Sequence, residues 1–317
     1  MSASPRELRT LGRTGIPVTA LALGTSPLSM PAHYGNPVGA SDHEEAVRTV
    51  LFALENGIRF LDTSNGYGDG GSERIVGEAL RRFGGLPDDV LLATKADPDP
   101  ETGDFGGARV RASLEESLER LGVDRIRVLY LHDPERIGFD RSMAEGGPVD
   151  ALLALRDAGS VDHLGIAGGP VPLLRQFIDT GLFDVLLSHN RYSLLDRSAA
   201  GLFATAASQG IGVVNAAPFG GGMLAKGPSQ RGEYAYGQGA PGLASAAARM
   251  AAICDGYGVG LASVALQFSM RNPDVHSTAI GASRASRVAA ALAEAEIPDA
   301  IWDDLEEATP EPSSWLG

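Results

Sequence analysis

Four polar side chains have the types and spacing needed for acid–base chemistry. Asp62, Lys95 and His132 each end an apolar run, and Tyr67 follows Asp62 by five residues. An aspartate and a lysine at the ends of buried strands reduce the cost of burying each other's charge when they pair. A lysine ammonium beside a tyrosine stabilises the phenolate and brings the phenol pKa down toward neutral pH. Tyr67 would then act as a general acid or base, and His132 would orient a carbonyl or hydroxyl group.

The composition excludes several other kinds of site. Cys254 is the only cysteine, which rules out an internal disulfide, a multi-cysteine zinc site and an iron–sulfur cluster. His33, His43, His163 and His276 show no ligand spacing, and the sequence lacks the His-x-His pair of metal-dependent barrel hydrolases, so we expect no metal. Since there is no Ser-His-Asp pattern either, the four side chains favour proton transfer coupled to hydride transfer with a bound cofactor.

These side chains need strands that bring them to one rim. Short apolar runs, most of them rich in Val, Ile or Leu, read as buried parallel strands. They span Val18–Gly24, Ile58–Thr63, Val90–Lys95, Val128–His132, His163–Ala167, Val185–Ser188, Gly212–Ala216 and Ser277–Gly281. Amphipathic segments between them predict helices over Asp42–Glu55, Ser72–Arg82, Ala108–Leu121, Pro148–Ala158, Val171–Thr180, Ser198–Gln209, Leu243–Tyr257 and Ala285–Ala295. This alternation predicts an α/β fold, a single (β/α)8 TIM barrel domain over residues 1–317, with its active site at the carboxyl ends of the strands.

Local signals mark the ends of these elements. Ser41 and Ser72 are expected to be helix N-caps, and glycines are expected just past helix ends at Gly57, Gly122, Gly159, Gly181 and Gly210. Additional elements are an N-terminal hairpin that closes the barrel bottom and two C-terminal helices. These span Leu8–Gly12 with Gly15–Val18, Leu261–Ser269 and Ile301–Ala308.

Two glycine-rich segments follow strand ends. Gly66–Gly71 matches the dinucleotide-binding pattern G-x-G-x-x-G, but it belongs to the second βα unit and carries an aromatic residue where a pyrophosphate would lie. It also lacks an acidic strand-end residue about 20 positions later, so we interpret it as an active-site loop. Pro218–Pro241 leaves the seventh strand and is expected to be a lid or a disordered connection.

Charge and hydropathy limit the partners and the location. The 40 acidic and 26 basic side chains give a net charge of −14, which makes nucleic acid and anionic membranes poor partners. A hydrophobic content of 44% is enough for a sizeable core. Because no charged-then-apolar leader is visible at Met1–Thr10, and no apolar stretch reaches about 18 residues, we expect a cytoplasmic chain. The oligomeric state cannot be read from these patterns.

The segments around the four side chains resemble those of the aldo-keto reductase family in order, spacing and strand context. They read Phe60-Leu-Asp-Thr-Ser-Asn-Gly-Tyr67, Leu92-Ala-Thr-Lys95 and Leu129-Tyr-Leu-His132. The resemblance covers nearly the whole chain, from Leu11 to Arg284. It implies a nicotinamide cofactor that gives or takes a hydride. Asp62, Tyr67, Lys95 and His132 are then the catalytic residues, with Tyr67 as proton donor or acceptor.

Within the family, three segments look similar to bacterial sugar dehydrogenases of the D-threo-aldose or L-fucose type, in the neighbourhood of galactose and pyridoxal dehydrogenases. They are Arg191–Asp196, Asn215–Phe219 and the Tyr234/Tyr236 segment. The resemblance thus implies oxidation of an aldose at C1. Two alternatives stay open: NADPH-dependent reduction of an aldehyde or ketone, including a pyridoxal-type one, and a regulatory protein that binds the cofactor as a sensor without turnover.

The resemblance also implies a set of cofactor contacts. His189 stands where the family binds the carboxamide, and Gly281 stands where a lysine often binds a 2′-phosphate. Because one cation is lost while Arg287 is kept, NAD is slightly favoured over NADP. The implied contacts are His189, Phe219, Gly220, Gly222, Gly281, Ser283 and Arg287.

Substrate selectivity is expected from loops at the barrel mouth, which carry binding residues in this fold. These loops are Ser26–Asn36, Pro134–Gly147 and Pro218–Pro241. Their aromatic residues Tyr34, Phe139 and Tyr236 are candidates to line a pocket for a small aldose or carbonyl substrate.

Overall fold

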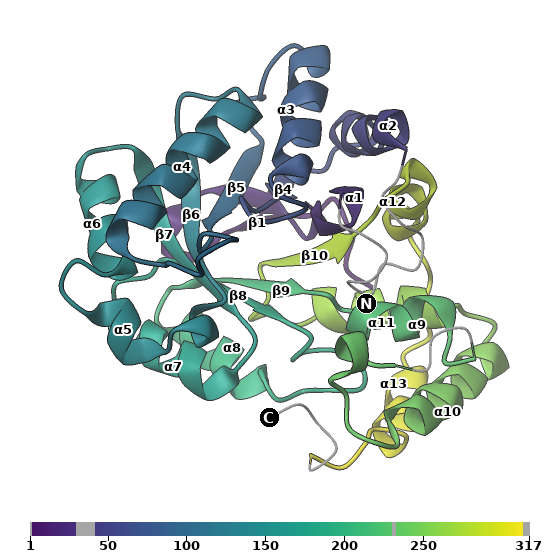
Figure 1. Ribbon diagram of the computed structural model, residues 1–317. Helices are drawn as coiled ribbons and strands as arrows, with labels where there is room; N and C mark the ends of the chain where they lie inside the picture. Colours follow the sequence, from purple (N-terminus) through teal and green to yellow (C-terminus); the bar gives the residue numbers. More distant parts are fainter. Residues whose placement is uncertain (1, 30–41, 230–232, 313–317) are drawn as a thin grey trace.

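The computed structural model describes residues 2–29, 42–229 and 233–312, and its centre is a barrel of parallel strands (Figure 1). Within those ranges eight strands pair in the order β10-β3-β4-β5-β6-β7-β8-β9 and close on themselves. Their bounds are Leu21–Gly24 (β3), Phe60–Asp62 (β4), Leu91–Ala96 (β5), Ile126–His132 (β6), Val161–Gly168 (β7), Val185–His189 (β8), Gly212–Ala216 (β9) and Ser277–Gly281 (β10). The predicted (β/α)8 barrel is confirmed.

Helices follow the strands and form the outer layer of the molecule (Figure 1). They are Ser26–Ser29 (α1), His43–Glu55 (α2), Gly71–Phe83 (α3), Gly107–Leu121 (α4), Phe139–Met143 (α5), Pro148–Asp157 (α6), Val171–Asp179 (α7), Ala200–Ser208 (α8), Met223–Lys226 (α9), Leu243–Gly256 (α10), Leu261–Met270 (α11), Ala285–Leu292 (α12) and Ile301–Glu307 (α13). Every predicted helix is present, and the short helices α1, α5 and α9 were not predicted. No single helix in the described ranges is long and apolar enough to cross a membrane; α10 and α11 meet that test only as a pair bent by 101°.

The helix ends correct the capping predictions. Asp42 caps α2, accepting the Glu44 N–H at 3.2 Å, while Ser41 lies outside the described residues. Ser72 is wrong as an N-cap, because α3 already begins at Gly71; its hydroxyl donates to the Thr25 carbonyl at 2.9 Å instead. The glycines predicted past helix ends all have positive φ, the left-handed conformation that such ends require.

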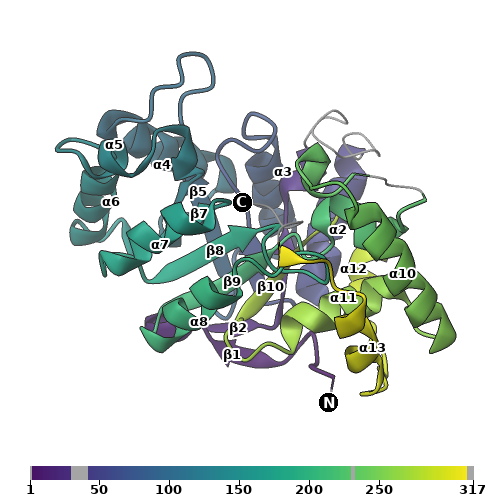
Figure 2. The same ribbon diagram turned by 90° about the horizontal axis from the view of Figure 1, so that it is seen from below.

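The predicted strand Val18–Gly24 is divided between two elements. The hairpin strand β2 (Pro17–Thr19) pairs with β1 (Leu8–Thr10), and β3 starts at Leu21. The chain bends between them at Ala20, where the Thr19 hydroxyl donates to the Leu21 carbonyl at 2.7 Å. A 3-10 helix, η1 (Gly12–Thr14), joins β1 to β2, and the Arg13 N–H donates to Gly210 just before β9 begins. The hairpin therefore lies at the amino end of the barrel, at the lower edge of the molecule in Figure 2.

Fully buried side chains fill the barrel interior. They include Leu11 and Ile16 from the hairpin segment, and Phe60, Val128 and Tyr130 from the strands. A larger cluster packs the outer faces of the strands against the helices. Because the interior is filled in this way, the polar side chains at the carboxyl ends of the strands are the ones left to form a site.

The segment Pro218–Pro241 is ordered where it is described, so the disordered alternative is wrong for that part. It contains the 3-10 helices η4 (Gly220–Gly222) and η5 (Ala235–Gly237) on either side of α9. Tyr234 anchors it: the side chain is 2% exposed and its hydroxyl bonds to Ser193 at 2.7 Å and donates to the Asn190 carbonyl at 3.1 Å. This anchor fixes the segment beside the end of β8.

Candidate active site

Lys95 on β5 and Asp62 at the end of β4 form a buried ion pair. The Lys95 ammonium donates to Asp62 Oδ1 at 2.7 Å and to the Thr63 carbonyl at 2.6 Å, and the lysine is 1% exposed. Burial alone lowers the pKa of Lys95, but the charges of Asp62 and Tyr67 act against it, so that the pKa lies above its ordinary value. The lysine therefore stays charged beneath the site.

Tyr67 lies in the loop between β4 and α3, above this ion pair. Its ring centroid is 4.7 Å from Lys95 Nζ, so the ammonium acts on the phenol at close range. Lys95 lowers the pKa of Tyr67 as expected, but burial raises it by more and Asp62 adds to the rise. The expected net fall in the pKa is therefore wrong, and Tyr67 carries its proton at neutral pH. It is poised to donate that proton.

His132, at the end of β6, completes the predicted group. Its ring meets the Tyr67 ring edge to face, with centroids 5.6 Å apart. Its Nδ1 lies 2.6 Å from Oδ1 of Asp97, which directly follows β5. Burial lowers the pKa of His132, but the charges of Asp133 and Asp97 raise it by more. The structure thus brings together Asp62, Tyr67, Lys95 and His132, and it adds Asp97.

Asp97 and Asp133 were missed by the sequence reasoning, although a signal for both was present. Asp97 lies two residues after Lys95, and Asp133 directly follows His132. The rule that polar side chains at strand ends gather at the barrel mouth applies to them as it does to Lys95 and His132. Their partners are set by loop geometry, which no sequence spacing indicates.

A charged network on α4 supports the loop that carries Tyr67. Arg109 donates to the side chains of Asn65 at 3.0 Å and Glu116 at 2.6 Å, and Asn65 donates back to Glu116 at 2.9 Å. Arg120 donates to the Asn65 carbonyl at 3.3 Å. These bonds hold the residue two positions before Tyr67 from both its backbone and its side chain.

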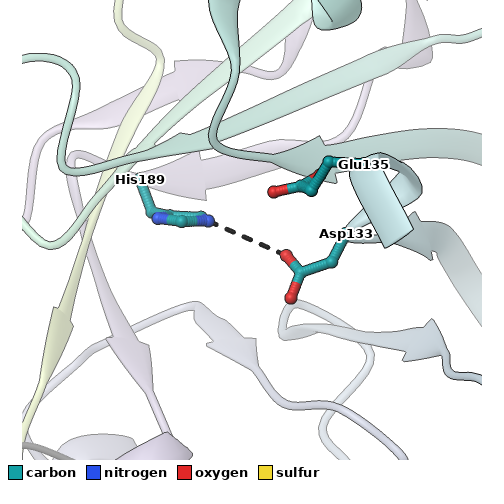
Figure 3. A group of neighbouring side chains, drawn as sticks. All are labelled: Asp133, Glu135 and His189. Carbon is teal, nitrogen blue, oxygen red and sulfur yellow. Dashed lines mark ion pairs between the residues drawn. The ribbon is translucent and has the colours of Figure 1, made fainter. Parts of the chain in front are cut away.

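His189 ends β8 and faces two carboxylates from the segment after β6 (Figure 3). Its Nε2 lies 3.7 Å from Asp133 Oδ1, and the Gly169 N–H donates to Glu135 at 3.2 Å. One polar atom from each of the three side chains lies within 4.8 Å of the others, close enough to share one polar group of a bound molecule. Burial raises the pKa of Asp133, but His132 and His189 together lower it by more, to well below its ordinary value, so the acid is ionised.

A cavity of about 350 Å³ opens at the carboxyl end of the barrel. Its walls follow the carboxyl ends of β3, β9 and β10, and β3 is the neighbour of β4 in the barrel. Four of its lining residues come from the implied cofactor contacts and one from the substrate candidates: Phe219, Gly222, Gly281, Arg287 and Tyr236.

The other predicted residues lie apart from this cavity or outside the described ranges. Gly220 and Ser283 are buried and do not line it. Phe139 packs against Phe177 with ring centroids 5.0 Å apart, which gives it a place in the hydrophobic packing. Tyr34 lies outside the described residues. Tyr236 is placed with the implied cofactor residues, so its part in a substrate pocket stays a prediction.

Comparison with known proteins identifies the family and several relatives of this chain. Residues 20–309 match the model of the aldo/keto reductase family. The chain is 35% identical to L-galactose dehydrogenase from Arabidopsis thaliana, over 89% of this chain and 86% of the relative. It is 34% identical to D-threo-aldose 1-dehydrogenase from a Pseudomonas species, over 93% and 95%. It is 30% identical to pyridoxal 4-dehydrogenase from Microbacterium luteolum, over 96% and 98%.

A solved structure has the same fold. It is the holo form of an aldo-keto reductase from Bacillus halodurans, which superposes with a TM-score of 0.77 at 24% identity and covers 96% of this chain and 97% of that one.

Proposed function

Since this chain belongs to the aldo/keto reductase family and is an oxidoreductase acting on carbonyl or CH–OH groups, we propose that it moves a hydride between a nicotinamide cofactor and C1 of an aldose. The observation that carries the proposal is the buried Lys95–Asp62 pair beneath Tyr67, with His132 at the same rim. Two relatives named as sugar dehydrogenases, each matched over most of its length, support an aldose as the substrate.

The residues present fit a bound nicotinamide nucleotide. Asp62 Oδ2 is buried and, among the described residues, has no hydrogen-bond partner, so a donor from a bound molecule would satisfy it. Gly281 opens the cavity wall, because a Cβ there would lie 2.8 Å from the Pro27 ring. Phe219, Gly222 and Arg287 would hold the phosphate and adenosine parts, and His189 with Asp133 and Glu135 would hold the amide.

The chemistry follows from the protonation states. A nicotinamide cofactor, when bound, would supply or accept the hydride at the sugar carbon. In carbonyl reduction, Tyr67 donates its proton to the oxygen that receives negative charge, and Lys95 stabilises the phenolate left behind. Oxidation is the reverse step: it starts from the phenolate form of Tyr67, which Lys95 stabilises, and that phenolate takes the hydroxyl proton. His132 holds the reacting oxygen, and Asp62 keeps Lys95 charged and in place.

The cavity slightly favours NAD as the cofactor. Arg287 lines it, but Arg284 does not, and Gly281 supplies no charge where a second cation could bind a 2′-phosphate. A single arginine still offers a bidentate phosphate contact, so NADP should bind with lower affinity rather than be rejected.

Reduction of a carbonyl compound is the second candidate. It is favoured by the raised pKa of Tyr67, which keeps the phenol protonated. The relative named pyridoxal 4-dehydrogenase supports an aromatic carbonyl compound in place of a sugar, and says nothing in favour of the reductive direction. Because pyridoxal is an aromatic aldehyde, a substrate panel separates it from sugars.

The test is a set of initial rates, measured by nicotinamide absorbance, with NAD and NADP against L-galactose, L-fucose, D-arabinose and pyridoxal, and in the reverse direction with NADH and NADPH against carbonyl compounds. We expect reduction of NAD by one of the sugars. Turnover only in the direction of carbonyl reduction would replace the sugar proposal with the second candidate. Cofactor binding without turnover in either direction would contradict both and favour a sensor.

A further inference from the structure

The Asp97 carboxylate accepts hydrogen bonds from three directions. His132 Nδ1 lies 2.6 Å from Oδ1, the Gly66 N–H donates to Oδ2 at 2.7 Å, and the Ser64 hydroxyl donates to Oδ2 as well. Asp97 is 5% exposed. Burial raises its pKa, but His132 and the other donors lower it by more, so the side chain is ionised and can only accept.

An ionised carboxylate at this distance decides where the imidazole carries its hydrogen. Since Asp97 has no proton to give, the hydrogen must lie on His132 Nδ1. Protonation of the ring then changes only Nε2. This atom accepts a hydrogen bond from a substrate hydroxyl when the ring is neutral, and donates one to a carbonyl when the ring is protonated. Both roles need Nε2 to face the substrate.

The same carboxylate links His132 to the loop of Tyr67. Ser64 and Gly66 precede Tyr67, and both donate to Asp97. The fit at Gly66 is tight, because a Cβ there would lie 2.9 Å from Asp97 Cγ. A single carboxylate, that of Asp97, therefore sets the position of both His132 and the Tyr67 loop.

We propose that Asp97 is a positioning residue. It fixes His132 in its Nδ1–H form and holds the imidazole ring in place relative to Tyr67. The expected effect on turnover rests on the proposed hydride transfer, whereas the hydrogen bonds around Asp97 do not depend on it. Among the described residues, no other acidic side chain lies within bonding distance of Nδ1.

Other charged groups also face His132. Asp133 Oδ1 lies 3.6 Å from Nε2 and has His189 on its far side, while Lys95 acts on the ring as a like charge. Asp133 would attract a hydrogen to Nε2 as well. The protonation of each ring nitrogen must therefore be measured by spectroscopy, because a pH profile of activity alone would not separate the effect of Asp97 from that of Asp133.

The first test is nitrogen NMR of histidine-labelled wild-type protein, with the His132 signals assigned by their loss in His132→Gln. We expect a hydrogen on Nδ1 bonded strongly enough to give a far-downfield proton signal. A neutral ring with its hydrogen on Nε2 alone would overturn the proposal, whether or not the protein turns over any sugar. This reading needs no Asp97 variant to fold.

The second test compares Asp97→Asn with Asp99→Asn, a matched change in the same loop. Within the described part of the chain, the hydrogen bonds of the Asp99 side chain go to its own turn, at Glu101 and Thr102. We expect Asp97→Asn to lose the downfield signal and at least about 10-fold in kcat, with cofactor affinity unchanged, because proton-transfer groups contribute roughly 10²- to 10⁴-fold. A folded Asp97→Asn with the wild-type signal and kcat would contradict the proposal. Failure of the wild type on every substrate, with the signal present, would contradict the proposed function alone.

Discussion

Lys95 and Asp62 form an ion pair 2.7 Å long that is almost wholly withdrawn from solvent, with 1% and 6% of the two side chains exposed. A buried ion pair of this kind adds little to the stability of the fold by itself, but removing one partner leaves the other charge buried and unpaired, which is destabilising. The pair is kept at the floor of the site, where the lysine charge acts on Tyr67. Stability and activity should therefore respond differently when the pair is dismantled.

We predict that Lys95→Met lowers the free energy of unfolding by about 3–5 kcal/mol, because it leaves Asp62 buried without a partner. The double variant Asp62→Asn with Lys95→Met should recover most of that loss while remaining inactive. Denaturant unfolding and initial rates on the same samples make the comparison. Equal stability of the single and double variants would contradict the coupling.

Arg287 should set the affinity for NADP more than that for NAD. It lines the cavity, whereas Arg284 is exposed and does not. We predict that Arg287→Ala raises the KM for NADP by about 10- to 100-fold and that for NAD only slightly, since a hydrogen bond to a charged group contributes roughly 1.5–3 kcal/mol. Arg284→Ala is the matched control. Equal effects of Arg287→Ala on the two cofactors would exclude a 2′-phosphate contact.

The network under the Tyr67 loop should make stability fall in acid. The hydrogen bond from Arg109 lowers the pKa of Glu116 from 4.5 to about 2. Since the folded pKa is the lower one, this stabilisation is present above about pH 4.5 and is lost as the pH falls toward about 2. Melting temperatures across this range should fall less steeply for Glu116→Gln than for wild type. An identical pH slope in the variant would show that Glu116 contributes nothing.

Gly66 should tolerate no side chain. A Cβ there would lie 3.1 Å from both Asp97 oxygens as well as 2.9 Å from Cγ, so Gly66→Ala must displace Asp97 or the Tyr67 loop. We predict a loss of kcat of at least about 10-fold, a part of the roughly 10²- to 10⁴-fold that positioned acid–base groups contribute. Gly201→Ala on α8, where a Cβ meets nothing within 4 Å, is the control and should raise stability by up to about 1 kcal/mol. Wild-type kcat in Gly66→Ala would show that the loop has room to move.

The sequence predicted the barrel and the strand-end residues because both depend on periodic patterns. Apolar runs separated by amphipathic segments predicted β4, β5 and β6. The barrel topology then brings Asp62, Lys95 and His132 to one rim. The break between β2 and β3 was missed, because the bend at Ala20 and the bond from the Thr19 hydroxyl to the Leu21 carbonyl lie inside a run that is mostly apolar.

The surroundings of the site were harder to predict. The net rise in the Tyr67 pKa depends on burial, which outweighs the nearby lysine. The contact between Asp97 and His132 joins residues 35 positions apart through a loop whose path no local pattern gives. Phe139 was an aromatic residue in a mouth loop, and only its packing on Phe177 shows where its ring goes.

The most direct test of the central claim is the turnover of Tyr67→Phe beside that of Tyr257→Phe, whose hydroxyl bonds to Asp304 between α10 and α13. Both variants remove one oxygen, and cofactor binding measured by fluorescence shows whether each remains folded. With the best aldose of the panel, we predict that Tyr67→Phe loses at least about 10²-fold in kcat while binding cofactor normally, because it removes the group that carries the proton. Tyr257→Phe should match wild type. Wild-type kcat in Tyr67→Phe would contradict the account.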